Sequence, residues 1–189
     1  SVDMVSYNKI NIIRGPETLL FGPNTIGGVI DVSRETGQNP IFKKFSFQSI
    51  SGFGTSNKCT YLNLTAYIPI NNRNQFRFSG LNRNAANQSS PIGTLANTGL
   101  SNNEIAAKYS YFGEFNQFNI TYDKITMDYG IPGSLEGHIN GVDIKMTKQT
   151  QKLNYHRDIR AFGFERIDID QRFITYSHSE FENGNDNSA

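Results

Sequence analysis

"CTYLNLTAYIPI", residues 59–70, decides the fold, because polar and apolar side chains alternate along its length. Successive side chains of an extended chain point to opposite faces, so this stretch predicts a strand with one apolar face and one polar face. After a polar start at Thr60, the apolar face carries Leu62, Leu64, Ala66, Ile68 and Ile70. The opposite face carries Tyr61, Asn63, Thr65 and Tyr67.

The same period of two continues toward the C-terminus. "QFRFSG" at 75–80 follows the turn "NNRN", and together with the first strand it predicts a hairpin. Residues 104–111 and 117–123 alternate in the same way and are joined by the short "FGEFN". Long polar stretches at 82–103 and 127–143 connect the other ends of these strands. Short turns at one end and long loops at the other predict an antiparallel meander, and thus an all-β fold.

The last third of the chain predicts two longer strands, within 142–155 and 161–182, whose alternation changes phase. The apolar residues Val142, Ile144 and Met146 occupy even positions, whereas Leu153 and Tyr155 occupy odd ones. An extra residue in one strand shifts the phase of all that follows, so we expect a β-bulge near Gln149.

Composition excludes several classes of function. The 189 residues carry 18 Lys and Arg against 17 Asp and Glu, a formal net charge of +1, so no field recruits nucleic acid. Cys59 is the only cysteine, which rules out an intrachain disulfide and a cysteine zinc cluster. The three histidines lie on separate segments, and no spacing forms a catalytic triad or a carboxylate pair. We therefore expect no enzymatic activity and no cofactor.

Alternation alone leaves two architectures open. In a soluble barrel or sandwich the apolar faces point inward, whereas in an outer-membrane barrel they point outward to lipid and the polar faces line a wet interior. The unequal loop lengths match the short periplasmic turns and long extracellular loops of outer-membrane barrels. Several strands also reach the roughly 9 to 11 residues that a tilted strand needs to cross a bilayer. These features favour the membrane architecture.

A different pattern stands near the start, in "INIIRGPETLLFGPNTIGGVIDV" at 10–32. The alternating strand stops at Arg14-Gly15-Pro16, and Pro16 is well placed to begin a short helical turn that Gly22 ends. Gly27-Gly28 then permits a tight passage into a second strand. Neither Lys-Ser/Thr nor a GxGxxG pattern accompanies the glycines, so a nucleotide-binding loop is excluded.

Residues 10–35, "INIIRGPETLLFGPNTIGGVIDVSRE", resemble the C-terminal end of the plug domain of TonB-dependent outer-membrane receptors. Further on, "LSNNEIAAKYSYFGEFNQFNITYDKITMDYGIPG" at 100–133 is similar to the barrel of the zinc- and iron-uptake subgroup of these receptors. "KQT" at 148–150 and "YSHSEFENG" at 176–184 are also similar to that subgroup. The resemblance covers nearly the whole chain.

The resemblance implies that residues 1–36 end a plug domain and that 37–189 are the first strands of a 22-stranded transmembrane barrel. At roughly 10 residues per strand, such a wall exceeds 189 residues, so we expect an incomplete barrel in a fragment of a longer receptor. The missing front would hold the export signal, most of the plug and the segment that contacts the TonB-ExbB-ExbD complex.

The resemblance also implies a function. Such a receptor lies in the Gram-negative outer membrane, in contact with its lipid. It binds a scarce metal ion, siderophore or haem, and it imports this ligand into the periplasm with energy from the inner membrane. Two alternatives remain open: a non-transporting outer-membrane barrel or adhesin, and a soluble β-sandwich that binds carbohydrate. An upstream TonB box and a full plug would exclude the first alternative, and apolar faces protected in water without detergent would support the second.

The family's plug residues can be carried over onto this sequence. Arg14 and Arg34 match plug arginines that pair with barrel carboxylates and hold the plug in place, against the alternative of solvated arginines near turns. The glycines of the plug turns correspond to Gly15, Gly22, Gly27 and Gly28.

The stretch "DYGIPGSLEGHINGVD" at 128–143 is the expected ligand-binding loop. Its candidate residues are Asp128, Tyr129, Glu136, His138 and Asp143. Carboxylates and imidazole suit a divalent metal, and His138 is the candidate metal ligand. The alternative is a polar loop that only contacts solvent, with Tyr129 shaping it.

We expect the chain expressed alone in detergent-free buffer to aggregate. An unclosed sheet leaves unpaired backbone groups at its edges, and outward apolar faces have no lipid to cover them. Size-exclusion chromatography with light scattering measures the outcome. A monodisperse monomer that unfolds cooperatively without detergent would contradict the expectation.

Overall fold

The computed structural model describes residues 9–21, 27–33, 42–134, 138–161, 164–182 and 185–187. The chain divides into two compact units, Ser1–Pro40 and Ile41–Ala189. Both contain antiparallel strands, which confirms the all-β fold class.

In the first unit, β1 (Lys9–Ile13) pairs with β2 (Val29–Ser33), and the 3-10 helix η2 (Pro16–Phe21) lies between them in sequence. The predicted order of strand, helical turn and strand is confirmed. Gly15 and Gly28 have φ angles of 82° and 127°, a backbone conformation that favours glycine. The hydroxyl of Thr18 donates to the Gly15 carbonyl at 2.8 Å and closes the turn. The described part of the chain has no helix long and apolar enough to cross a membrane.

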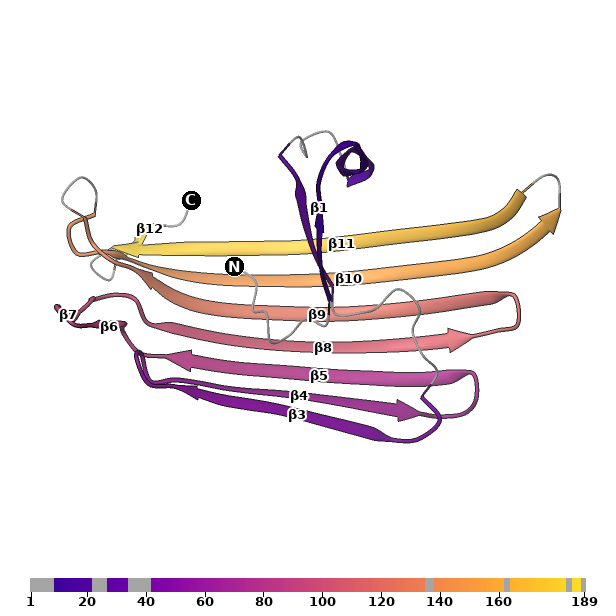
Figure 1. Ribbon diagram of the computed structural model, residues 1–189, viewed down its shortest axis with the longest axis horizontal. Coiled ribbons are helices and arrows are strands. Elements are labelled where there is room, and N and C mark those ends of the chain that lie inside the picture. The colour runs from indigo at the N-terminus through magenta and orange to yellow at the C-terminus, as the bar shows by residue number, and fades with distance from the viewer. Residues whose placement is uncertain are drawn as a thin grey trace. The chain divides into compact units, whose positions relative to one another are not determined.

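The second unit is built on an eight-stranded sheet whose strands follow their sequence order, β3-β4-β5-β8-β9-β10-β11-β12 (Figure 1). The strands are β3 (Ser46–Gly54), β4 (Cys59–Pro69), β5 (Asn74–Ala85), β8 (Leu100–Phe112), β9 (Asn116–Ile131), β10 (Val142–Ala161), β11 (Phe164–Glu182) and β12 (Asn185–Asn187). All neighbours are antiparallel, so the predicted meander is confirmed. Strands β3 and β12 are the two edges of this sheet.

The lengths of the connections differ between the two ends of the sheet, as predicted. Residues 70–73 and 113–115 form short turns at one end. At the opposite end, hereafter the long-loop end, 86–99 and 132–141 form long connections, and 55–58 form a short turn. The connection 86–99 contains a small hairpin of β6 (Ser89–Ser90) and β7 (Gly93–Thr94). Both long connections are shorter than the sequence suggested, because the flanking strands extend further.

The predicted β-bulge near Gln149 is wrong. The pairing of β10 runs without interruption from Asp143 to Arg157 on both of its neighbours, and its one register shift lies between Asp158 and Ala161. The apolar residues of β10 therefore change from one face of the sheet to the other. Strand β9 does the same, with Ile125 and Met127 on the face opposite Phe118, Ile120 and Tyr122.

A row of three residues couples the edge strand to its neighbours. Gly52, Tyr61 and Arg83 lie opposite one another on β3, β4 and β5. The Tyr61 ring covers the glycine so closely that a Cβ on Gly52 would lie 2.4 Å from it. The Arg83 guanidinium in turn stands 5.0 Å from the centre of the Tyr61 ring. An aromatic side chain thus fills the space that the glycine leaves.

Gly52→Ala should displace the end of the Tyr61 ring and destabilise the sheet by about 1 kcal/mol, the low end of the cost of overpacking, because the far end of this side chain can move. Urea unfolding of the chain in detergent micelles measures this loss. Gly54→Ala is the matched control, because its Cβ would meet Cys59 at an ordinary 3.5 Å on the same strand and face. Equal stability of the two variants would contradict the role of Tyr61.

Candidate functional site

The sheet has one face on which apolar side chains are exposed, hereafter the apolar face. Phe47, Phe78 and Ile105 are 57%, 44% and 56% exposed there. Strand register places the following residues on this face: Phe47, Leu62, Leu64, Ala66, Ile68, Phe76, Phe78, Ile105, Ala107, Tyr109, Tyr111, Phe118, Ile120, Tyr122, Leu153, Tyr155, Ile167, Ile169 and Phe173.

The apolar face ends at a row of amides toward the long-loop end. Asn82 and Asn103 stand opposite each other on β5 and β8, and the Asn82 amide donates to the Asn103 carbonyl oxygen at 2.6 Å. Asn84 donates to the Asn82 oxygen at 2.9 Å. On β9 the same face changes to Lys124 and Thr126. A polar margin therefore borders the apolar face on these strands.

The opposite face, hereafter the polar face, buries polar and charged side chains. Its buried polar residues on β4 to β10 are Asn63, Thr65, Gln75, Asn102, Glu104, Lys108, Ser110, Asn119 and Thr150. Asn102 is fully buried, and its amide donates to the Glu104 carboxylate at 3.0 Å. Arg77 lies over the Tyr67 ring at 5.8 Å, as Arg83 does over Tyr61. Burial on these strands is thus the reverse of that in water-soluble domains.

Buried large apolar residues form only a small group in the described part of the chain. They are Leu81, Ile125, Met127, Val142 and Ile144, all on the polar face near the long-loop end. The apolar face therefore does not converge on a dry centre within the sheet, which is what a soluble sandwich requires.

The expected ligand-binding loop is a loop only over 132–141. Asp128 and Tyr129 lie in β9, and Asp143 lies in β10, so the prediction of a loop over all of 128–143 is wrong. Pairing continues there because Tyr129 and Ile144 stand opposite each other and keep both strands extended. Asp128 and Asp143 belong to the face opposite Tyr129, so these three side chains do not converge.

His138 lies in this loop and its Nδ1 is 2.9 Å from Glu182 Oε2 at the end of β11. Glu136 lies outside the described residues. No group of three or more His, Cys, Asp or Glu side chains suited to a metal ion occurs among the residues that the structure describes. Metal binding by His138 stays a prediction, for which the structure offers one carboxylate neighbour.

The candidate plug residues lie in the first unit. Arg14 is exposed directly after β1, and Gly15, Gly27 and Gly28 occupy the turn positions before η2 and before β2. Arg34 and Gly22 lie outside the described residues. A pairing of Arg14 with a barrel carboxylate stays a prediction.

Sequence reasoning missed a set of hydrogen bonds made by Asn97 at the long-loop end, hereafter the clasp. Asn97 adopts a φ of 54°, and its Nδ2 donates to the carbonyls of Ile131 at 2.9 Å and Val142 at 3.1 Å. The amide of Gly130 also donates to the Gly99 carbonyl at 3.1 Å. The two long connections are therefore joined where β9 ends and β10 begins. Asparagine tolerates a positive φ better than most residues, which is the one local signal in "LANTGL".

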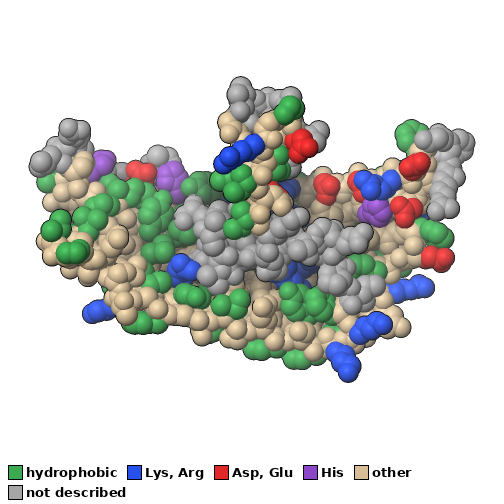
Figure 2. All heavy atoms as spheres, viewed as in Figure 1, with side chains coloured by type: hydrophobic (Ala, Val, Ile, Leu, Met, Phe, Trp, Pro, Cys, Tyr) green, Lys and Arg blue, Asp and Glu red, His purple; other side chains and the backbone are tan. Residues whose placement is uncertain are grey.

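A second group missed from the sequence lies on the polar face, near the end of β10 and the start of β11. The ring of His156 contacts Asp168 at 2.7 Å and Asp158 at 3.3 Å, and Arg166 contacts Asp168 at 2.6 Å. Charged side chains gather at this end of the sheet, on the right in Figure 2. All four side chains are at least one third exposed, so these pairs contribute little stability.

Comparison of the chain with protein-family models and with curated proteins gives no match.

Asn97→Gly should loosen the clasp while keeping the positive φ. The loss of two hydrogen bonds costs about 1 to 3 kcal/mol of local stability, so amide exchange at Gly130 should accelerate roughly tenfold. Hydrogen exchange read by mass spectrometry in detergent measures this change. Asn72→Gly, in the exposed turn at the other end of the sheet, is the control. Unchanged exchange at Gly130 would show that Asn97 does not hold the two connections together.

Proposed function

We propose that this chain forms part of a TonB-dependent receptor of the Gram-negative outer membrane, which imports a scarce metal ion, metal chelate or haem into the periplasm. The observation that carries the proposal is the reversed burial of the eight-stranded sheet: apolar side chains are exposed on one face, and polar ones are buried on the other. The sequence resemblance to the plug and barrel of these receptors agrees with it.

The physical argument concerns what covers the apolar face. Apolar surface in water costs about 25 cal/mol per Å², and monomeric soluble proteins rarely expose large continuous apolar patches. Hydrocarbon removes this cost, and a lumen filled with water and polar groups suits side chains such as Asn63, Thr65 and Asn119. The reversed burial therefore favours a membrane wall over a soluble carbohydrate-binding sandwich.

The open edges of the sheet fit the same proposal. Unpaired backbone groups cost several kcal/mol each in lipid, so β3 and the far edge at β12 require further strands beside them. In the proposed receptor these belong to a closed 22-stranded barrel, and residues 1–36 end its plug. The long-loop end faces the cell exterior, where the connections joined by Asn97 contribute to ligand capture.

A non-transporting barrel or adhesin has the same two faces, so transport must be tested directly. In a strain that lacks the gene carrying this chain, we expect poor growth when one of iron, zinc or haem is limiting, and recovery with the wild-type gene. Equal growth of the deletion strain under every limitation, with the protein present in the outer membrane of the parent, would favour the non-transporting barrel.

Ala107→Arg should prevent recovery in the same strain. Ala107 stands between Phe78 and Tyr122 in the middle of the apolar face, and arginine at the bilayer midplane costs about 2 to 4 kcal/mol. Quantitative blotting of the outer-membrane fraction measures the loss of protein. Ser101→Arg is the matched control, because it lies on the same strand and face but opposite Asn84, at the polar margin. Wild-type levels of Ala107→Arg would contradict a lipid-facing apolar face.

A further inference from the structure

Two methionines and a histidine form one row across three neighbouring strands of the sheet, hereafter the Met-Met-His row. Met127 on β9 stands directly opposite Met146 on β10, and Met146 stands opposite His178 on β11. The row lies on the polar face toward the long-loop end, four residues from the ends of β9 and β11. Opposite residues on antiparallel strands have Cβ atoms roughly 5 Å apart, so these three side chains can reach one point above Met146.

Exposure increases along the row from β9 to β11. Met127 is 3% exposed and belongs to the small group of buried apolar residues described above. Met146 is half-buried, and the side chain of His178 is 37% exposed. An ion in solution can therefore reach the row at the histidine and be held beside side chains that are shielded from water.

Two neighbours on β11 position the imidazole of His178. Its Nε2 lies 3.5 Å from Glu180 Oε1, and its ring centroid lies 5.8 Å from that of Tyr176. A carboxylate beside one ring nitrogen orients a metal-binding imidazole, and the other nitrogen then binds the metal. Glu180 fits this supporting role and leaves Nδ1 of His178 as the ligand atom.

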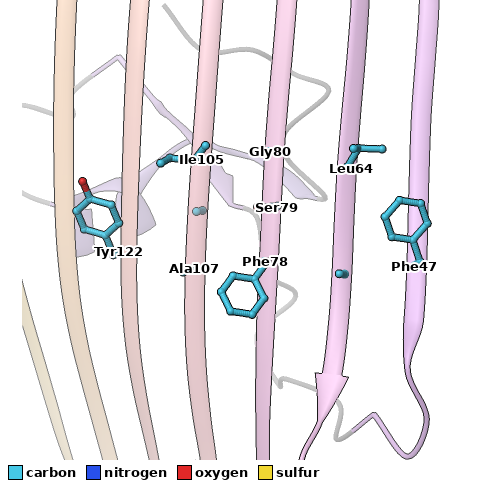
Figure 3. Close-up of a pocket in the computed structure, with 10 residues that line it drawn as sticks. Phe47, Leu64, Phe78, Ser79, Gly80, Ile105, Ala107 and Tyr122 are labelled. Carbon is cyan, nitrogen blue, oxygen red and sulfur yellow. The ribbon is translucent and has the colours of Figure 1, made fainter.

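The hollow on the opposite, apolar face has no ligand atoms of this kind. It measures about 400 Å³ and is lined by residues such as Phe47, Phe78 and Tyr122, which Figure 3 shows as sticks. None of its lining residues has a sulfur atom, an imidazole or a carboxylate. A metal ion would therefore find ligands in the Met-Met-His row and not in this hollow.

We propose that the Met-Met-His row binds copper(I), an inference that rests on the proposed function and names its metal. Thioether sulfur is a soft ligand that selects Cu(I), and imidazole also suits copper. Zinc instead takes thiolate, imidazole and carboxylate ligands. Because two of the three ligands are thioethers, the row is distinct from the groups of His, Cys, Asp and Glu considered for His138.

The charges near the row also favour a singly charged ion. Lys148 lies two residues from Met146 on the same face, and its ammonium repels a divalent cation more strongly than Cu(I). The carboxylate of Glu180 balances the single charge of Cu(I). The long-loop end faces the cell exterior in the proposed receptor, so the row lies on the side from which the ion enters.

Met146→Leu removes the central sulfur and keeps the volume of the side chain. The measurement titrates Cu(I), kept reduced by ascorbate, into the 189-residue chain in detergent micelles, in competition with the chelator bathocuproine disulfonate. We expect the association constant for Cu(I) to fall at least about tenfold, since even the loss of a partner behind a metal ligand costs about 10- to 100-fold. Met127→Leu should have the same effect.

Ile144→Leu is the matched control. It alters a buried apolar residue two positions from Met146 on the same strand and face, and it removes no ligand, so the affinity for Cu(I) should not change. X-ray absorption at the copper edge should show sulfur bound to copper in the wild type, and this signal should be lost when both methionines are replaced by leucine. Circular dichroism checks that all variants have equal strand content.

The results that would overturn the inference are distinguishable from failure of the proposed function. Absence of Cu(I) binding, or equal affinity in the wild type and both methionine variants, would remove the site. An equal loss of affinity in Ile144→Leu would mean that packing and not sulfur determines the affinity. If the gene still restores growth under iron, zinc or haem limitation, the proposed function stands without the site. Copper bound at the row, with equal growth of the deletion strain under every limitation including copper, would retain the site and remove transport.

Discussion

The second unit depends on one constraint, the antiparallel register of its long strands, which shifts only between Asp158 and Ala161. Because side chains alternate with a period of two, a slip of one residue would carry every apolar side chain of a strand to the opposite face. Pairs such as Leu64 with Gly80 and Ala107 with Tyr122 continue the same alternation from strand to strand. The two faces and the amide row both follow from that agreement.

Local patterns predicted the strands well, because alternation is a property of neighbouring residues. Residues 59–70 and 104–111 indicated both the strands and the two faces that the structure shows. Alternation alone could not predict the direction of those faces, since the same alternation serves a dry core and a lipid-facing wall, and the expectation of a membrane wall came from loop and strand lengths. The bulge near Gln149 was wrong for a related reason: Ile125, Met127 and Ile144 gather on the polar face near the long-loop end, so the phase changes without an extra residue.

The candidate site was less predictable because its contacts join distant parts of the chain. Asn97 is one of many asparagines in polar connections, and its partners at Ile131 and Val142 are visible only once β9 and β10 are paired. His138 likewise meets Glu182 from the far end of β11. In contrast, Asp128 and Asp143 looked like loop residues, because polar side chains at exposed strand ends have the same composition as a loop.

The amide row of Asn82, Asn84 and Asn103 has a mechanical consequence in the proposed bilayer. Its side chains bind one another at the end of the apolar face, so the change from carbon to amide is abrupt on these strands. Moving these strands deeper into the bilayer by two residues, about 7 Å along a strand, would bury the amides in hydrocarbon. Moving the strands outward by the same distance would expose Ile105 to water. The row therefore fixes the depth of these strands in the proposed bilayer.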